Sequence, residues 1–310
     1  MARSRRQNVS VPSGYVLTAP ARAYLRWAPW RFGKRALWSR VAAPLARRPR
    51  RFVARTSHGF WIEGDQRLLM SRCIYWFGAW EPPLSAWIRG VLRPGDVFVD
   101  VGANFGYFSL LAARAVGPIG SVVAVEASAT TVRRLERNLA RNRFSNVRIV
   151  HAVAGANDGR VPFYRAPWND AESTTVPTQK HEPEGDVPAA PLPRLLTVEE
   201  LARVRVIKID VEGGELGVVE GLLPAIGALR DDAELAIEVH PAALARQGAS
   251  VAELLGLVAR AGFHARELPV DFSEIGHLFA AHPDPAVLGA GDGVRHLILT
   301  RGAPRRASTK

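Results

Sequence analysis

Hydrophobic residues follow two alternating patterns between residues 96 and 153. Short runs rich in Val are typical of buried β-strands, whereas Leu135 and Leu139 share one face of a segment with helical spacing. Strands that alternate with helices of this length predict a parallel sheet with right-handed crossovers. The expected strands span residues 96–103, 121–127 and 147–153, and the expected helices span residues 107–116 and 130–143.

The same alternation resumes after residue 203 and brings the expected total to about seven strands. The sequence therefore predicts an α/β fold with a doubly wound, mostly parallel, seven-stranded sheet of Rossmann-like type. The later strands are expected at residues 204–211, 234–240 and 294–300, and the later helices at residues 215–223 and 251–261.

A Pro-rich polar stretch at residues 162–195 separates the two halves of this pattern. It is too long for an ordinary connection between a strand and a helix. We expect either a lid with its own hairpin or an insertion that binds the acceptor substrate.

The main domain is expected to span residues 96–302, followed by a basic tail at residues 303–310.

The N-terminal residues 1–62 form a basic arm that several prolines punctuate. Apolar side chains between Trp30 and Leu45 recur at helical spacing among arginines, which predicts a short amphipathic helix. Residues 63–95 are rich in aromatic side chains, and we expect a helical approach segment that covers one edge of the core. The prolines of the arm are Pro12, Pro20, Pro29, Pro44 and Pro49.

Composition favours a single large globular core, because 47% of the 310 residues are hydrophobic. The single cysteine, Cys73, excludes an intramolecular disulfide and a cysteine-based zinc site. The basic start is not followed by the apolar stretch of a signal peptide, and no transmembrane helix is expected. The expected location is the cytoplasm.

The net charge of +12 is concentrated in the arm. Glu63 is the first acidic residue, and the fourteen Lys and Arg that precede it leave a formal charge of −2 on the remaining chain. Three interpretations of the arm stay open: docking on the protein's own body, peripheral contact with an anionic membrane at its inner face, and contact with nucleic acid. A basic arm on a nearly neutral body does not favour nucleic acid as the partner.

The clearest chemical signal is a glycine-containing turn where the first core strand becomes a helix. Asp100, Gly102, Asn104 and Gly106 stand at alternate positions, and such a turn lets the backbone approach a nucleotide-like ligand at a helix N-terminus. A dinucleotide fingerprint that starts at Gly102 needs glycine at positions 104 and 107, where Asn104 and Tyr107 stand. The turn therefore predicts an adenosyl ligand other than a dinucleotide.

Two further strand ends are expected to contact that ligand. Glu126 ends the second strand, where doubly wound folds place a carboxylate beside the ribose hydroxyls. Asn157 and Asp158 follow the third strand, and we expect them to reach the adenine edge. The alternative for Glu126 is a solvent-facing carboxylate at a strand end.

Acidic residues gather after the fourth strand, where Asp210 and Glu212 should face the same cleft as Gly102. Acids this close together are costly unless a sulfonium, a substrate proton or a metal meets them. His240 follows the next strand and is expected either to act as a general base or to hydrogen-bond its neighbours. We assign Asp210, Glu212 and His240 as catalytic candidates and assign no residue as a metal ligand.

With these residues in place, the chain resembles the FkbM family of S-adenosylmethionine-dependent methyltransferases. The resemblance implies a class I methyltransferase fold, S-adenosylmethionine as cofactor, and O-methylation of a sugar, polyketide or other small-molecule or glycan acceptor. It also implies that the turn through Tyr107 contacts the cofactor. The motifs that carry the resemblance are Phe77-Gly-Ala-Trp-Glu-Pro82, Arg93-Pro-Gly-Asp-Val-Phe-Val-Asp-Val-Gly-Ala-Asn-Phe-Gly-Tyr107 and Ile207-Lys-Ile-Asp-Val-Glu-Gly213.

The chain departs from the family pattern at two places. Glu126-Ala127 stands where the family usually has Glu-Pro, and Pro191-Leu192-Pro193 stands where it has a Leu-Asp pair. Rival interpretations are a nucleic-acid-modifying methyltransferase that the arm guides, a nicotinamide-dependent oxidoreductase, and a binding module without catalysis. The failed dinucleotide fingerprint disfavours the oxidoreductase, and the acids at both strand ends disfavour the binding module.

Overall fold

The computed structural model describes residues 14–28, 32–46, 51–166, 173–271, 273–279, 284–288 and 293–301. Trp30 and the expected basic tail at residues 303–310 lie outside these ranges. Within the described residues, none of the helices combines the length and the apolar character that crossing a membrane requires.

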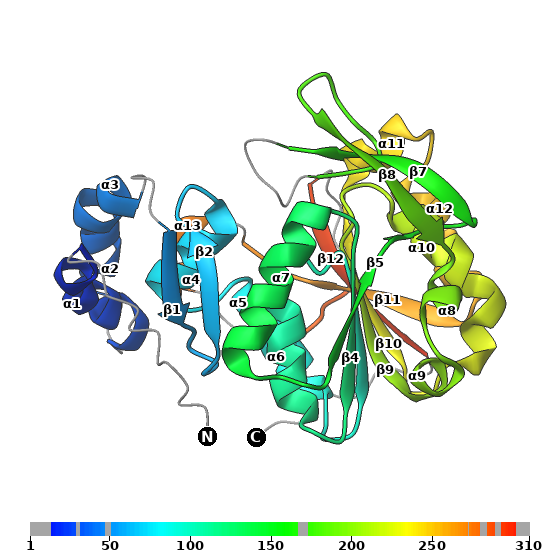
Figure 1. The fold of residues 1–310 in the computed structure, drawn as a ribbon, viewed down its shortest axis with the longest axis horizontal. Helices are drawn as coiled ribbons and strands as arrows, with labels where there is room; N and C mark the ends of the chain where they lie inside the picture. Colours follow the sequence, from blue (N-terminus) through cyan, green and yellow to red (C-terminus); the bar gives the residue numbers. More distant parts are fainter. Residues whose placement is uncertain are drawn as a thin grey trace, which may run out of the picture.

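Seven strands form the central sheet in the order β11-β12-β10-β9-β3-β4-β5 (Figure 1). Neighbours from β10 to β5 pair in parallel, whereas β12 runs antiparallel to both β10 and β11. This arrangement confirms the predicted doubly wound, mostly parallel sheet. The strands are β3 (Val97–Val101), β4 (Ser121–Glu126), β5 (Val147–His151), β9 (Val204–Ile209), β10 (Glu234–Val239), β11 (Phe263–Leu268) and β12 (Arg295–Arg301).

Both faces of the sheet are covered, so its central strands are buried along their whole length. Alternate side chains of β3 enter different cores: Phe98 packs in one, and Val97 and Val99 pack in the other. Helices on one face are α5 (Pro82–Val91), α6 (Tyr107–Val116) and α7 (Ala129–Asn142); those on the other are α8 (Leu192–Leu195), α10 (Glu215–Leu222) and α12 (Val251–Arg260). Shorter helices are α9 (Val198–Arg203), η3 (Leu223–Ala228), α11 (Pro241–Arg246) and α13 (Glu274–Phe279).

The described part of the arm docks on the protein's own body. Thr18 on α1 and Tyr75 on α4 share a hydrogen bond of 2.7 Å between their hydroxyls, and Arg26 donates to main-chain carbonyls near the end of α4. Trp38 contacts Trp76 edge to face, with ring centroids 5.9 Å apart. The elements are α1 (Gly14–Trp27), α2 (Lys34–Leu37), a π-helical turn η1 (Trp38–Ala42), α3 (Ala43–Ala46) and α4 (Leu69–Phe77).

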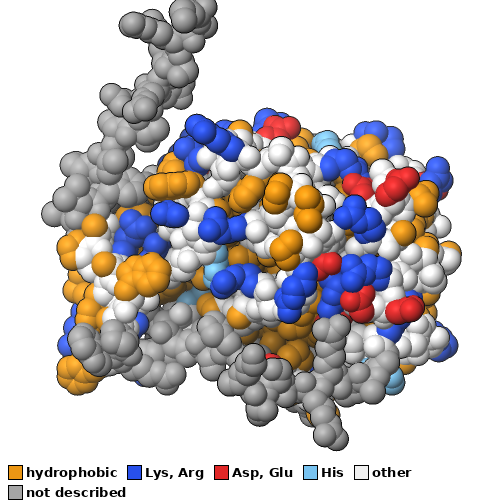
Figure 2. Space-filling model, turned by 90° about the horizontal axis from the view of Figure 1, so that it is seen from below, with side chains coloured by type: hydrophobic (Ala, Val, Ile, Leu, Met, Phe, Trp, Pro, Cys, Tyr) orange, Lys and Arg blue, Asp and Glu red, His pale blue; other side chains and the backbone are white. Residues whose placement is uncertain are grey.

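A hairpin that the sequence did not predict joins the arm to α4. Its strands, β1 (Arg51–Arg55) and β2 (Trp61–Asp65), pair antiparallel, and β2 crosses the expected boundary at residue 62. The arm also keeps exposed aromatic side chains: Trp27 is 67% exposed and Phe32 is 90% exposed. Figure 2 shows one face of the molecule, on which Lys and Arg side chains lie among exposed hydrophobic ones.

The Pro-rich stretch forms a hairpin of its own above the main sheet (Figure 1). Strand β7 (Gly159–Arg165) pairs antiparallel with β8 (Glu182–Ala190), and the short β6 (Val153–Ala154) pairs parallel with β8. Near the hairpin tip, Thr174 exchanges two main-chain hydrogen bonds with Tyr164 and donates its hydroxyl to the Glu212 carbonyl at 3.0 Å. The tip is thereby tied to the loop that follows β9.

Candidate functional site

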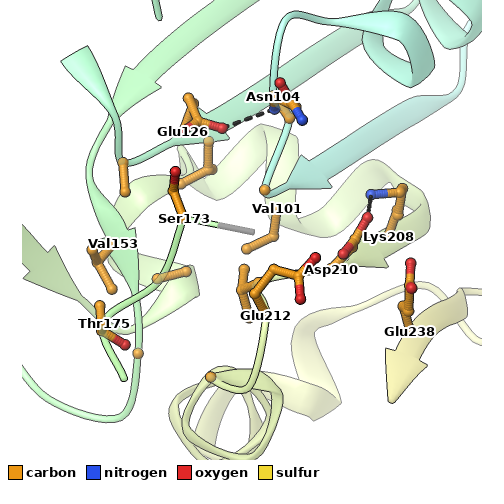
Figure 3. Close-up of a pocket in the computed structure, with 18 of the residues that line it drawn as sticks. Val101, Asn104, Glu126, Val153, Ser173, Thr175, Lys208, Asp210, Glu212 and Glu238 are labelled. Atoms are coloured by element: carbon orange, nitrogen blue, oxygen red, sulfur yellow. Dashed lines mark hydrogen bonds and ion pairs between the residues drawn. The ribbon is translucent and has the colours of Figure 1, made fainter. Parts of the chain in front are cut away.

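The carboxyl ends of β3, β4, β9 and β10 open onto one cavity of about 720 Å³. Figure 3 shows Asn104 and Glu126 on one side of this cavity and Asp210, Glu212 and Glu238 on the other. Parallel strands end at the same edge of a doubly wound sheet, which is where such folds bind ligands. Side chains from the β7–β8 hairpin, including Phe163, complete the lining.

The turn after β3 lies directly against the loop after β9. Gly102 has a φ of 79°, and a Cβ atom there would lie 1.8 Å from the Asp210 carbonyl oxygen. The Gly102 amide donates to the Val125 carbonyl, and the Asp210 amide donates to the Val101 carbonyl, each at 3.0 Å. Only glycine permits this approach, so the turn fixes the distance between the two sides of the cavity.

Glu126 is held as an oriented acceptor at the cavity wall. Its two carboxylate oxygens accept the main-chain N–H groups of Asn104 and Ser128, each at 2.8 Å. Asn104 adopts a left-handed φ of 50°, which turns its N–H toward this carboxylate. Burial raises the pKa of Glu126 to about 7, although the two hydrogen bonds favour the charged form.

Three of the expected cofactor residues do not contact the cavity with their side chains. Asp100 is fully buried beneath it and accepts the Ser109 hydroxyl at 2.6 Å. Tyr107 is also fully buried, because the first turn of α6 directs its ring into the core, where its hydroxyl meets Ser85 at 3.1 Å. Asp158 is half-exposed and forms an ion pair with Arg194.

The other expected cofactor residues lie at the cavity or next to it. Gly102, Asn104, Glu126 and Asn157 line it. Gly106 precedes α6 with a φ of 94° and packs against the Leu135 side chain, so its role is to start the helix. The structure thus gathers four of the eight expected cofactor residues around one space.

The three catalytic candidates, Asp210, Glu212 and His240, all line the same cavity. His240 Nε2 lies 3.1 Å from Glu238 Oε1 and 3.6 Å from Glu212 Oε2. Burial alone would lower the His240 pKa, but the hydrogen bond to Glu238 and the charge of Glu212 raise it to about 9. The shift favours the protonated form of His240, in which its ring nitrogens act as hydrogen-bond donors.

Lys208 forms ion pairs with Asp210 at the cavity and with Asp100 beneath it. Its Nζ lies 2.9 Å from Asp210 Oδ2 and 3.7 Å from Asp100 Oδ1. Burial opposes the charge of Lys208, but the two carboxylates outweigh it and raise the Lys208 pKa above its usual value. Burial and the charge of Glu238 raise the pKa of Asp210, whereas Lys208 opposes that shift.

Sequence reasoning gave no role to Glu81, although it lies in one of the motifs quoted above. Glu81 precedes α5 with a left-handed φ of 39°, is 2% exposed and lines the cavity. Lys208 and Glu238 also line it and were likewise left without a role. For Glu81 the available signal was an acidic side chain directly before two prolines that begin a helix, Pro82 and Pro83.

Comparisons with known proteins identify the family to which most of the core domain is similar. Residues 100–265, which hold both the glycine turn and the acidic cluster, match the family described as the methyltransferase FkbM domain. Methyltransferase 1 of Beauveria bassiana is 29% identical over 150 residues, covering 42% of this chain and 59% of that protein. Methyltransferase sdnD of Sordaria araneosa is 30% identical over 160 residues, covering 42% of this chain and 61% of that protein.

The chain thus spans about three-fifths of the length of these curated relatives. Among solved structures, the methyltransferase FkbM from Methylobacillus flagellatus KT superposes with a TM-score of 0.43 at 17% identity. That superposition covers 69% of this chain and 50% of the other.

Proposed function

Because the chain belongs to the FkbM methyltransferase family, we propose that it transfers a methyl group from S-adenosylmethionine to a hydroxyl of a small-molecule or glycan acceptor. One observation carries the proposal: four strand ends open onto a single cavity with an oriented carboxylate on one side and an acid–histidine cluster on the other. Such a cavity can hold a nucleoside at one end and a reacting hydroxyl at the other.

S-adenosylmethionine is the methyl donor of this family, and the described residues fit it. Gly102 lines the cavity, and the Glu126 carboxylate offers acceptor oxygens to the two ribose hydroxyls. Asn157 lines the wall beside Glu126 and is proposed to contact the adenine edge. Burial and neighbouring carboxylates raise the pKa values of Asp210 and Glu212, and a sulfonium cation beside them would stabilise their charged forms.

The bound cofactor supplies an electrophilic methyl group, and the protein positions the acceptor oxygen in line with it. Holding the two reacting atoms about 3 Å apart can contribute roughly 7 kcal/mol or more. The hydroxyl proton would leave as the oxygen accepts the methyl group, because an alcohol is too weak an acid to ionise first, so a side chain of the protein must take that proton. Asp210 is the proposed base, and protonated His240 donates a hydrogen bond that orients the acceptor.

The mixed lining of the cavity supports an acceptor that carries both hydroxyls and an apolar face. Met70, Trp80 and Phe108 line the cavity together with the carboxylates of Glu212 and Glu238. A sugar ring presents a face of C–H groups to an aromatic ring and hydroxyls to carboxylates at its edge. The acceptor class we propose is therefore a polyhydroxylated molecule or glycoconjugate.

The test combines cofactor binding with methyl transfer on the full-length protein. We expect calorimetry to detect S-adenosylhomocysteine binding, and labelled methyl groups to enter a product when cell extract is supplied. Asp210→Asn is expected to lower turnover far more than cofactor affinity, because it removes the base and keeps the shape of the side chain. Lost cofactor binding with intact turnover at saturation would contradict that role.

The same binding assay separates the rivals. NADH should produce no fluorescence change, since Asn104 and Tyr107 replace glycines of the dinucleotide pattern. If NADH binds while neither S-adenosylmethionine nor S-adenosylhomocysteine does, the proposed methyltransferase function is wrong.

A further inference from the structure

A second cluster of ligand-type side chains lies beneath the cavity, apart from Asp210 and Glu212. Glu81 precedes α5, Glu238 lies near the end of β10, and His296 lies on β12. All three residues are at most 8% exposed, and one donor atom from each lies within 4.8 Å of the others. Three separate elements therefore bring two carboxylates and one imidazole to a single buried point.

The distances within this cluster are those of donors that share a cation. His296 Nε2 lies 3.6 Å from Glu81 Oε2 and 3.6 Å from Glu238 Oε2. These separations are too long for hydrogen bonds. Two donors that each lie about 2.1 Å from a tetrahedral metal ion are separated by about 3.4 Å.

The buried carboxyl of Glu81 supplies an independent reason for a cation at this point, because burial and the carboxylates of Glu238 and Asp210 raise its pKa and a bound cation would stabilise its charged form. Its Oε2 atom is buried without a hydrogen-bond partner, and it points into the cluster, 3.6 Å from His296 Nε2. A buried carboxylate oxygen without a donor is costly. The neighbouring cation Lys208 is engaged by Asp210, and His240 is hydrogen-bonded to the other oxygen of Glu238.

The backbone holds Glu81 in this orientation at a further cost. Its φ of 39° is left-handed, and its main-chain N–H donates to His277 Nε2 at 3.3 Å. A non-glycine residue keeps such a conformation only where its surroundings impose it. The segment between α4 and α5 thus directs one carboxylate toward Glu238 and His296.

We propose that Glu81, Glu238 and His296 bind one divalent cation. A set of two carboxylate oxygens and one imidazole nitrogen suits Mn²⁺ or Zn²⁺ better than Ca²⁺, which prefers oxygen alone. Glu81 and Glu238 also line the cavity, so the remaining coordination positions face the space assigned to the acceptor. There the cation would bind the acceptor hydroxyl oxygen and acidify it, while the proton passes to Asp210.

Only this catalytic role rests on the proposed function, because cation binding itself can be measured without an acceptor. Full-length protein stripped with a chelator would be titrated with MnCl₂ by calorimetry. We expect one Mn²⁺ per chain, pulsed electron paramagnetic resonance to detect a coordinated histidine nitrogen, and a rise in melting temperature with Mn²⁺.

Comparing Mn²⁺ affinity between variants of Glu81 and Glu212 shows which of the two groups binds the ion. Glu81→Gln is expected to weaken Mn²⁺ binding at least tenfold while S-adenosylhomocysteine affinity, measured in the same preparation, stays unchanged. Glu212→Gln is the matched control, because Glu212 belongs to the neighbouring Asp210–Glu212–His240 group, and it should retain Mn²⁺ affinity. If Glu81→Gln does not fold, Glu81→Asp keeps the charge on a shorter side chain and should bind Mn²⁺ with reduced affinity.

Three results would overturn the proposal. They are the absence of saturable Mn²⁺ and Zn²⁺ binding by the wild type, unchanged affinity in both Glu81 variants, and a loss confined to Glu212→Gln, which would place the ion in the neighbouring group. If Mn²⁺ binds through Glu81 and no acceptor is methylated, the cation site stands and the proposed function fails.

Discussion

At the scale of single residues, Gly102 and Gly262 share a left-handed backbone but differ in their surroundings. Both have a φ near 80°, yet a Cβ at Gly102 would meet the Asp210 carbonyl, whereas nothing lies within 4 Å of one at Gly262. Gly262→Ala should cost only the backbone strain, about 1–2 kcal/mol. Gly102→Ala should cost more than that and weaken S-adenosylhomocysteine binding at least tenfold, because the β3 and β9 loops must separate.

Urea unfolding gives the two free energies, and calorimetry gives the two affinities. Equal destabilisation of the two variants, with cofactor affinity unchanged in both, would mean that the contact between Gly102 and Asp210 does not shape the site.

Glu126 predicts a pH dependence of cofactor binding. Burial raises its pKa to about 7, so the carboxyl is protonated below that pH and ionised above it. The ionised form accepts hydrogen bonds from ribose hydroxyls, and binding should therefore weaken as the pH falls from 8 to 6. Glu126→Gln should bind S-adenosylhomocysteine about tenfold more weakly at pH 8, the loss expected for about 1.4 kcal/mol, with little pH dependence.

Calorimetry of both proteins across this pH range checks the expectation. A wild-type affinity that stays flat from pH 6 to pH 8 would argue against an ionised Glu126 at the ribose. Asp210→Asn serves as the control, since its cofactor binding should keep the wild-type pH dependence.

The sequence predicted which strand ends meet, but not where every side chain points. Glu126 and Asp210 were assigned because parallel strands end at one edge, and both line the cavity. The same rule places the backbone of Tyr107 close by, but the first turn of α6 directs that ring into the core. Glu81 precedes helix α5, which no strand-end rule covers, so only the folded structure brings it to Glu238.

At the scale of elements, the Thr174 hydroxyl ties the segment between β7 and β8 to the loop after β9. Thr174 donates to the Glu212 carbonyl and accepts the Val176 amide, each at 3.0 Å. Thr174→Val removes both interactions, at about 1 kcal/mol each, and should speed hydrogen exchange of the Val176 amide at least fivefold. The acceptor KM should rise as the tip loosens.

Thr174→Ser retains the hydroxyl and is the matched control, so its exchange rates should stay close to those of the wild type. Equal exchange in the Val and Ser variants would show that main-chain pairing with Tyr164 alone holds the tip.

Whether the sequence located a strand depends on how the two faces of that strand are buried. Strands β3, β9 and β10 are buried on both faces, so most of their residues are apolar, and the sequence located them. Strand β11 lies at the sheet edge with largely half-exposed side chains. Its polar residues His264, Arg266 and Glu267 interrupt the apolar pattern, so the sequence did not indicate a strand there. The β1–β2 hairpin was missed for a related reason, since arginines at both ends of β1 gave it the composition of the arm.

At the scale of the whole molecule, the described part of the arm docks on the body and leaves two aromatic side chains exposed. Residues such as Leu25 and Trp38 are buried against the body, whereas Trp27 and Phe32 remain exposed on a segment rich in arginine. Aromatic side chains beside cationic ones favour an anionic lipid surface. We therefore expect the full-length protein to sediment with anionic liposomes, and to do so less at high salt or in the Trp27→Ala/Phe32→Ala double variant.

The control variant is Val198→Ala, which changes an exposed apolar residue on α9 and should sediment as the wild type does. If the wild-type protein stays in the supernatant at low salt, the proposed membrane contact is wrong.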